Sequence, residues 1–194
     1  RTGSYGWNNA YPIWIDAEEF DRLSRIDTAL PPDELLNNLL QAIALYKGDF
    51  LPKTSMEPWV VPISTYYHSQ YLKAVHYAVE KLNEQARFED IIAICQDAIA
   101  VDPYDEPLHL ATIRALIDTG MQQKALQHYN YVTDLFMKGF GINPSPELVA
   151  LYKEIIKTTK TMETNLHVIR EELREHEHSS TAFYCEYEIF KDIY

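Results

Sequence analysis

The feature that most constrains the fold is a 34-residue period in the middle of the chain. The period appears when one unit is placed with its start at Leu72 and the next with its start at Glu106, just after the "DPYD" that ends the first. The residues that then share equivalent places are Ala86 and Gly120, Ile91 and Ala125, Cys95 and Tyr129, and Ala98 and Val132. A single unit of this length cannot bury its apolar face alone, so the period predicts pairs of helices stacked one on the next.

A first helix is predicted ahead of this repeat by a capping signal. In "IDAEEF", Asp16 can cap and Glu19 follows three residues later, so the two side chains can satisfy backbone N–H groups reciprocally. The helix is expected to start at Asp16, to run to about Arg25 and to bury Phe20 and Leu23.

A second helix is predicted from Asp33 to Tyr46 by its hydrophobic spacing. Its apolar stripe comprises Leu35, Leu36, Leu39, Leu40, Ile43 and Ala44. Gly48 is expected to close this helix in a left-handed conformation, and Pro52 prevents its continuation.

The remaining helices follow from proline, glycine and serine signals. Residues 56–85 are predicted as one long helix or two in succession, with Pro62 in a first turn or at a kink. Further on, Gly141 closes a helix and Ser145 caps the next. That last helix should bury one face, formed by Leu148, Leu151 and Ile155.

Helix, tight turn and helix, with small residues where helices cross, resemble the tetratricopeptide repeat (TPR). The resemblance implies an all-α, TPR-like helical repeat, an alpha-alpha superhelix. The sequence departs from the TPR pattern at Val75, His109 and Val79. The inner face of such a superhelix is concave and is lined by the first helix of each pair. Two hypotheses stand equally for these side chains, a binding groove or plain solvated surface, and the residues concerned are Lys73, His76, Glu80, Asn83, Leu110, Arg114 and Ile117.

Composition excludes several classes of protein. The net charge is -12, so this chain repels a phosphate backbone and is not expected to grip nucleic acid by itself. Cys95 and Cys185 are the only cysteines, too few for a disulfide scaffold or a thiolate zinc site. No apolar run is long enough to span a bilayer and no signal peptide is visible, so a soluble, cytoplasmic protein is expected, with no membrane partner.

Enzymatic chemistry has no visible motif in this sequence. Phosphate-cradling glycine loops, nucleophile elbows and paired metal-binding histidines are missing, so no catalytic residue, cofactor or metal is predicted. Cys95 falls at a core position, where a buried thiol is inert. His109 beside Asp105 and Glu106 looks like an acid–base cluster, but is predicted to be a packed side chain next to a helix cap. The run His176-Glu177-His178 is read as a solvated helix end.

Landmarks outside the repeat give a narrower resemblance. They are "LYKGDFLP", Trp59, "DPYDEPLH", Gly120 with Lys124-Ala125-Leu126 and Tyr129, "GINPSPEL", and Leu151-Tyr152. Their order and spacing resemble the bacterial transcriptional activator domain (BTAD), the TPR-like middle domain of SARP-type transcriptional regulators, over residues 10 to 157. Leu110 departs from the family, in which an arginine commonly follows the histidine of "DPYDEPLH".

The family resemblance implies a division of the chain into four segments. In such regulators a winged-helix DNA-binding domain precedes this one, and "RTGSYGW" looks like its last strand, so residues 1–9 are expected to be its remnant. Residues 10–160 would form the BTAD, and residues 161–178 a connecting helix. Residues 179–194 would open a further domain, similar to degenerate nucleotide-cyclase-like modules. Short strand-like segments are therefore expected at both ends.

The resemblance also implies a function. The domain is expected to be non-enzymatic, to mediate self-association as a homodimer or contact with other domains or RNA polymerase, and to reach DNA only through the winged-helix domain. Two alternatives stay open: a free-standing TPR adaptor that binds a peptide, and the regulatory segment of a nucleotide-cyclase-like signalling protein.

Overall fold

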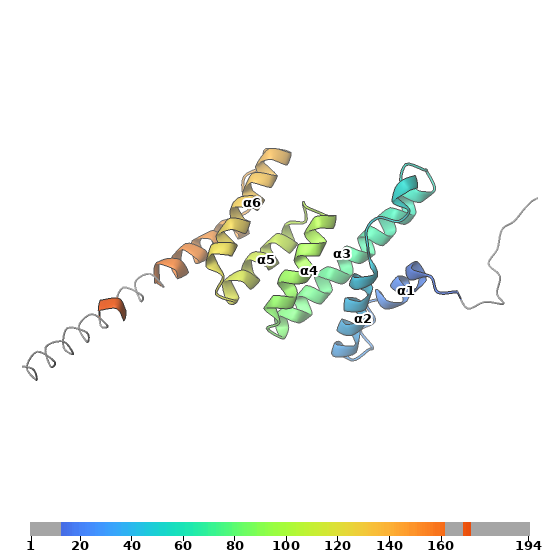
Figure 1. Cartoon of the computed structure of the whole chain (residues 1–194), viewed down its shortest axis with the longest axis horizontal. Helices are drawn as coiled ribbons and strands as arrows, with labels where there is room; N and C mark the ends of the chain where they lie inside the picture. Colours follow the sequence, from blue (N-terminus) through green and yellow to red (C-terminus); the bar gives the residue numbers. More distant parts are fainter. Residues whose placement is uncertain (1–12, 162–168, 172–194) are drawn as a thin grey trace, which may run out of the picture. The chain divides into compact units, whose positions relative to one another are not determined.

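The computed structural model describes residues 13–161 and 169–171, and within them every regular element is helical (Figure 1). The chain divides into two compact units, one ending at Thr119 and the other beginning at Gly120. The all-α prediction is therefore confirmed for this part of the chain. The strand-like segments predicted at residues 1–9 and 179–194 lie outside the described residues.

The first unit begins with helices α1 (Asp16–Leu23) and α2 (Pro32–Leu45). The capping box predicted for α1 is wrong: Ile15 is the N-cap, no side chain caps the helix, and Glu19 pairs with Arg22 at 2.6 Å. Asp16 Oδ1 instead accepts a hydrogen bond from the adjacent Ala17 N–H. The helix also ends at Leu23, two residues earlier than predicted, although Phe20 and Leu23 are buried as expected.

Helix α2 confirms most of its predicted stripe and corrects one position. Leu35, Leu36 and Leu39 are almost fully buried, but Ala42 lies in the core and Ala44 is exposed. The helix ends before Gly48, whose φ of 125° belongs to the following loop, so the predicted glycine closure of α2 is wrong. A short 3-10 turn, η1 (Pro52–Thr54), follows in that loop.

Helix α3 (Val60–Glu84) is one continuous helix of 25 residues, with Pro62 in its first turn. Helices α4 (Phe88–Val101) and α5 (Glu106–Asp118) follow, and successive helices from α2 to α5 run antiparallel (Figure 1). Ala86 and Gly120 both have left-handed backbones, with φ of 53° and 77°. The equivalent turns predicted by the 34-residue period are therefore confirmed.

One apolar core joins α1 to α5. Leu36, Val75, Leu82, Ile91 and Cys95 are among its members, and none of them is more than 2% exposed. Burial of each such aliphatic side chain stabilises the fold by roughly 1.5–3 kcal/mol. The core therefore fixes α3 between α2 and α4.

The second unit contains helix α6 (Gln122–Phe140) and a further helix over residues 146–161. Gly141 ends α6 with a left-handed φ of 67°, and Ser145 Oγ accepts a hydrogen bond from the Leu148 N–H at 3.1 Å. Both terminal signals are as predicted. The predicted buried face is also present, formed by Leu148, Leu151 and Ile155.

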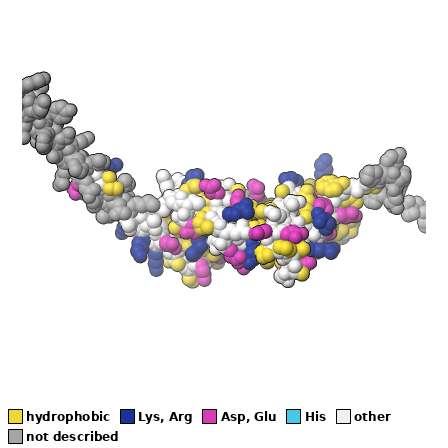
Figure 2. Space-filling model, turned by 90° about the horizontal axis from the view of Figure 1, so that it is seen from below, with side chains coloured by type: hydrophobic (Ala, Val, Ile, Leu, Met, Phe, Trp, Pro, Cys, Tyr) yellow, Lys and Arg dark blue, Asp and Glu magenta, His cyan; other side chains and the backbone are white. Residues whose placement is uncertain are grey.

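The surface mixes hydrophobic and charged side chains. Figure 2 shows yellow hydrophobic groups reaching the surface among acidic and basic ones on one face of the molecule. Among the described residues, no helix has the length and apolar character needed to cross a membrane.

Candidate functional site

The loop between α2 and α3 is held in place by aromatic side chains. Tyr46 stacks on Tyr71 of α3 with ring centroids 4.2 Å apart, and Phe50 stacks on Tyr67 at 5.6 Å. Phe20 of α1 lies against Tyr46 and Tyr67, at 6.0 and 5.8 Å. Aromatic pairs at such distances contribute about 0.5–1.5 kcal/mol beyond area burial, so three elements are tied together at the loop.

Burial raises the pKa of the tyrosines of this cluster further above physiological pH. Desolvation, and then Asp49, raise the pKa of Tyr46 to about 12, and desolvation followed by Asp97 raises the pKa of Tyr71 to about 12. Both hydroxyls therefore stay protonated at physiological pH and can donate hydrogen bonds. Tyr46 donates to Asp49 at 3.4 Å, whereas no hydrogen bond joins Tyr71 to another described residue.

Two hollows lie on either side of the loop and share Tyr46, Lys47, Gly48 and Asp49 as lining. The first, of about 390 Å³, lies between the loop and α1 and is lined by aromatic rings. The second, of about 660 Å³, lies between α2 and α4. We call this second hollow the α2–α4 groove, and its lining residues are Leu40, Ile43, Ala44, Tyr46, Lys47, Gly48, Asp49, Tyr71, Ile94, Asp97, Ala100 and Val101.

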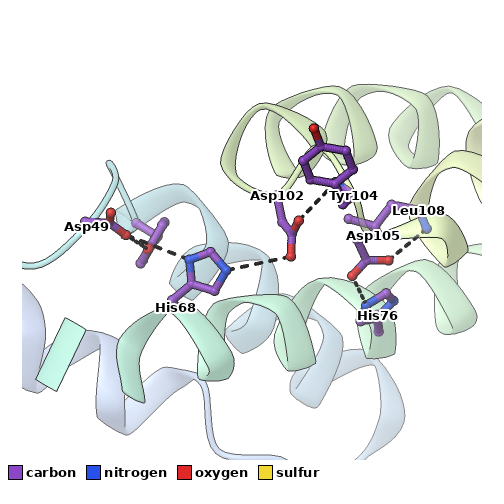
Figure 3. A network of polar contacts seen from close by, with 8 residues as sticks. Asp49, His68, His76, Asp102, Tyr104, Asp105 and Leu108 are labelled. Carbon is purple, nitrogen blue, oxygen red and sulfur yellow. Dashed lines mark hydrogen bonds and ion pairs between the residues drawn. The ribbon is translucent and has the colours of Figure 1, made fainter. Parts of the chain in front are cut away.

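A chain of histidine and aspartate side chains connects the loop to the turn after α4 (Figure 3). His68 of α3 lies between two carboxylates, with Nδ1 3.8 Å from Asp49 and Nε2 3.9 Å from Asp102. Asp102 also accepts a hydrogen bond from the Tyr104 N–H at 3.0 Å. The His68 ring therefore brings the loop, α3 and the turn after α4 together.

A second histidine binds the start of α5. His76 Nε2 lies 2.8 Å from Asp105 Oδ2, and Asp105 Oδ1 accepts the Leu108 N–H at 3.2 Å (Figure 3). Asp105 is therefore the N-cap of α5, as predicted, and one carboxylate serves both the cap and the contact with α3.

Cys95 and His109, the two side chains that the sequence suggests as reactive groups, are buried in the packed interior. Cys95 is fully buried, and desolvation raises the pKa of its thiol to about 11. His109 is also fully buried, and its Nε2 lies 2.9 Å from the Pro103 carbonyl oxygen. Desolvation lowers the pKa of His109, opposed by Pro103 and nearby carboxylates. Neither group is placed to attack or protonate a substrate.

Metal binding finds no support in this part of the molecule. Within residues 13–161 and 169–171, no three His, Cys, Asp or Glu side chains come together as a possible metal site. The two carboxylates beside His68 face opposite nitrogens of one ring, so they do not converge on a common ion. The segment His176-Glu177-His178 lies outside the described residues.

The seven side chains predicted to line an inner groove lie on α3 and α5. Lys73, Glu80 and Asn83 are exposed, and His76 is half-buried beside Asp105. On α5, Arg114 is exposed while Leu110 and Ile117 are half-buried. Neither hollow beside the loop is lined by any of the seven. A groove at these residues therefore stays a prediction.

The α2–α4 groove and the His68 contacts were not predicted from the sequence. A signal existed for part of them: Tyr67 and Tyr71 are four residues apart, and His68 and His76 eight apart, so each pair shares a face of one helix. The segment "LYKGDFLP" is a family landmark, but the positions of its tyrosine and phenylalanine depend on the contacts that they make with α3.

Comparison with solved structures shows the same fold at low sequence identity. Mycobacterium tuberculosis EmbR, in a complex with a low-affinity phosphopeptide, is 23% identical, with a TM-score of 0.56 over 74% of this chain and 37% of that chain. The Hsp90 co-chaperone Cns1 from Saccharomyces cerevisiae is 9% identical, with a TM-score of 0.56 over 84% of this chain and 45% of that chain. The chain therefore spans less than half the length of either protein.

Among curated proteins, none is similar enough to count as a relative. The family comparison is decisive by contrast: the bacterial transcriptional activator domain matches residues 15–156. This range covers well over half of the chain and agrees with the landmarks from "LYKGDFLP" to Leu151-Tyr152. The chain therefore belongs to the bacterial transcriptional activator domain family, the TPR-like middle domain of SARP-type transcriptional regulators.

Proposed function

We propose that this chain is the regulatory domain of a bacterial transcriptional regulator and that it works by binding other protein domains. The observation that carries the proposal is the family match over residues 15–156, together with a helical repeat fold. Helical repeats present extended surfaces that suit protein binding.

The proposal includes the absence of catalysis by this domain. Cys95 and His109, the side chains most able to act as nucleophile or base, are fully buried and take part in packing. The thiol pKa of about 11 leaves almost no thiolate at neutral pH. The burial of Cys95 and His109 supports the proposal that both residues stabilise the fold and do not take part in catalysis.

DNA binding is proposed to reside in a winged-helix domain preceding this one. The net charge of -12 opposes contact between this chain and a phosphate backbone. We propose that a signal shifts the population between two packings of the helical domain against its neighbours, and so changes how the winged helix engages DNA. The contacts proposed are with the regulator's other domains, with a second copy or with RNA polymerase, in the cytoplasm.

The inner surfaces of α3 and α5 are proposed as one contact area. Exposed Lys73, Glu80 and Arg114 offer both charge signs, and half-buried Leu110 and Ile117 add apolar area. Substitution of Arg114 by Glu should weaken a contact through this area, whereas Lys53→Glu in the loop between α2 and α3 makes the same change of net charge at an exposed position elsewhere.

The test compares the full-length regulator, expressed from its own gene, with a variant from which residues 15–156 have been deleted. A reporter gene downstream of its target promoter should lose regulation in the shortened protein, while a gel shift should still show DNA binding by the winged helix. This chain alone should not bind duplex DNA at physiological salt. Sub-micromolar binding by this chain at that salt, or unchanged regulation in the shortened protein, would contradict the proposal.

A further inference from the structure

Among the described residues, the apolar lining of the α2–α4 groove is left partly exposed. Leu40 and Ile43 of α2 face Ile94 and Val101 of α4 across it, and all four side chains are only half-buried. Tyr71 of α3, which is 2% exposed, also lines it. The groove therefore has two helical walls and a third helix that contributes the stacked tyrosine.

Small side chains keep the groove wide enough for another segment of protein. Ala44 on α2 and Ala100 on α4 are exposed and belong to the lining, whose volume is about 660 Å³. Packed helices lie about 8–10 Å apart when the side chains between them are small or interdigitate. Alanines on both walls are therefore favourable for the close approach of a third helix.

We expect a negative electrostatic field at the groove, from the helix ends and the charged side chains that line it. Four of the lining residues lie in the last turns of α2 and α4, where the helix dipoles place negative partial charge: Ile43, Ala44, Ala100 and Val101. Neither helix contains a lysine or arginine. Asp97 is the one acidic residue of these two helices that lines the groove, whereas Asp33, Glu34, Glu89 and Asp90 lie in the first turns, away from it.

Carboxylates within the lining add to this field. Asp97 is exposed and forms no ion pair or hydrogen bond with another described residue, and Asp49 is 58% exposed at the groove's edge. Lys47 is the one basic residue of the lining. The groove therefore favours an apolar segment flanked by positive charge.

A helix suits these walls better than an extended strand does. The backbone groups of α2 and α4 are already used within their own helices, so they cannot pair with the backbone of a strand. A helix satisfies its own backbone groups and can offer apolar side chains at every third or fourth position. A second copy of α2 or α4 is disfavoured because both lack basic residues.

We propose that the α2–α4 groove is the docking site for a basic amphipathic helix of a partner protein. Its aliphatic face would pack on Leu40, Ile43, Ile94 and Val101, with lysine or arginine side chains directed at Asp97. This inference rests on the proposed function, since it assigns one of the protein contacts of the regulatory domain to a particular surface.

The direct test titrates the 194-residue chain with a synthetic peptide and follows backbone amides by NMR. The probe is an amphipathic peptide of about 18 residues, long enough to form a helix, with leucine on one face and lysine on the other. Amides of residues 40–44 and 94–101 should shift. A scrambled peptide of the same composition, and a peptide with glutamate in place of lysine, should bind at least roughly tenfold more weakly.

Variants of α4 separate specific docking from attraction to a negatively charged protein. Ala100→Arg fills the groove and should weaken binding by roughly tenfold or more, whereas Ala93→Arg places the same side chain on the same helix outside the lining. Asp97→Lys should weaken binding more than Glu89→Lys, which changes the net charge equally. Both residues of each pair are exposed, so circular dichroism should show equal folding.

Three outcomes would overturn the docking proposal: equal binding of the scrambled peptide, equal effects of Ala100→Arg and Ala93→Arg, or a dimer of this chain that Ala100→Arg disrupts. Each leaves the regulatory function standing if removal of residues 15–156 still abolishes regulation. Loss of that reporter effect would instead contradict the proposed function, whatever the peptide does.

Discussion

The two turns related by the 34-residue period have nearly the same backbone but different central residues. Residues 85–87 have φ values of -91°, 53° and -88°, and residues 119–121 have -84°, 77° and -92°. The central residue is Ala86 in one turn and Gly120 in the other. A left-handed backbone costs a residue with a Cβ about 1–2 kcal/mol, so the first turn carries strain that the second avoids.

The core positions of the two repeats differ more than their turns. Cys95 is fully buried in the first repeat, whereas the equivalent Tyr129 is half-buried and stacks on Tyr152 with ring centroids 4.9 Å apart. The two repeats therefore share the backbone conformation of their turns, whereas the side chains at equivalent core positions differ. The turns and the core positions can be tested separately.

The largest difference between the repeats is expected in thiol reactivity. Burial raises the pKa of the Cys95 thiol from 9.0 to about 11, which lowers the thiolate fraction at pH 8 by roughly a hundredfold. Alkylation by iodoacetamide, followed by peptide mass spectrometry, should be slower at Cys95 by at least that factor than in urea. Tyr129→Cys provides the matched control at the half-buried equivalent position and should react much faster. Modification of native Cys95 at its rate in urea would contradict the buried core position.

The next largest effect is expected from valine in the turns. Gly120→Val should destabilise the protein by about 2 kcal/mol, because a β-branched residue is strained in a left-handed backbone. No atom lies within 4 Å of the position of an added Cβ at Gly120, so this cost is conformational rather than steric. Ala86→Val should cost less, since Ala86 already has a Cβ. Urea unfolding measures both, and a Gly120→Val protein as stable as the parent would show that this turn does not need glycine.

Exchange of alanine and glycine at positions 86 and 120 should change the free energy of unfolding by a smaller amount. The change should have opposite signs in the two turns. Ala86→Gly relieves the left-handed strain but adds freedom to the unfolded chain, so a net gain of about 0.5 kcal/mol is expected. Gly120→Ala should lose about 1 kcal/mol. Changes of the same sign in the two variants, measured by the same unfolding titration, would mean that the turns are not equivalent.

Local signals explain which parts of the fold were predictable. Asp105, Gly141 and Ser145 act on backbone groups within a few residues of themselves, and their predicted roles are confirmed. Asp16 failed as a cap although its sequence pattern was similar. Glu19, the partner it needed, forms a hydrogen-bonded ion pair with Arg22 instead.

Long-range contacts explain why the candidate site was missed. His68 joins Asp49 to Asp102, which are 53 residues apart in the sequence, and the α2–α4 groove exists only because α3 lies between its two walls. Neither helical periodicity nor capping specifies such distances. The period gave the order of the helices and the turns, whereas the surfaces between non-adjacent helices required the structure.

The smallest expected difference between the repeats is a pH dependence that arises from a buried histidine at one of two equivalent positions. His109 is equivalent to Val75, and both are fully buried. The Pro103 carbonyl can only accept, so His109 carries a proton on Nε2, and burial favours the neutral form of the ring. Desolvation lowers its pKa from 6.5, while Pro103, Asp105, Glu106 and Asp102 oppose that shift.

The direction in which stability changes with pH follows from the pKa of His109 in the folded and in the unfolded chain. Below about pH 6.5 the unfolded chain binds a proton at His109 that the folded chain does not, so stability falls as the pH drops from there toward the lowered pKa of the folded state. Urea unfolding at pH 7.5 and 5.5 should show a smaller loss for His109→Gln than for the parent, because glutamine does not titrate and its amide can still donate to Pro103. Val75→Gln is not a suitable control, because it would bury an amide without a partner. The quantity compared is therefore the change in the free energy of unfolding between pH 7.5 and 5.5 within each protein. An equal or steeper loss in His109→Gln would contradict a lowered pKa of His109 in the folded state.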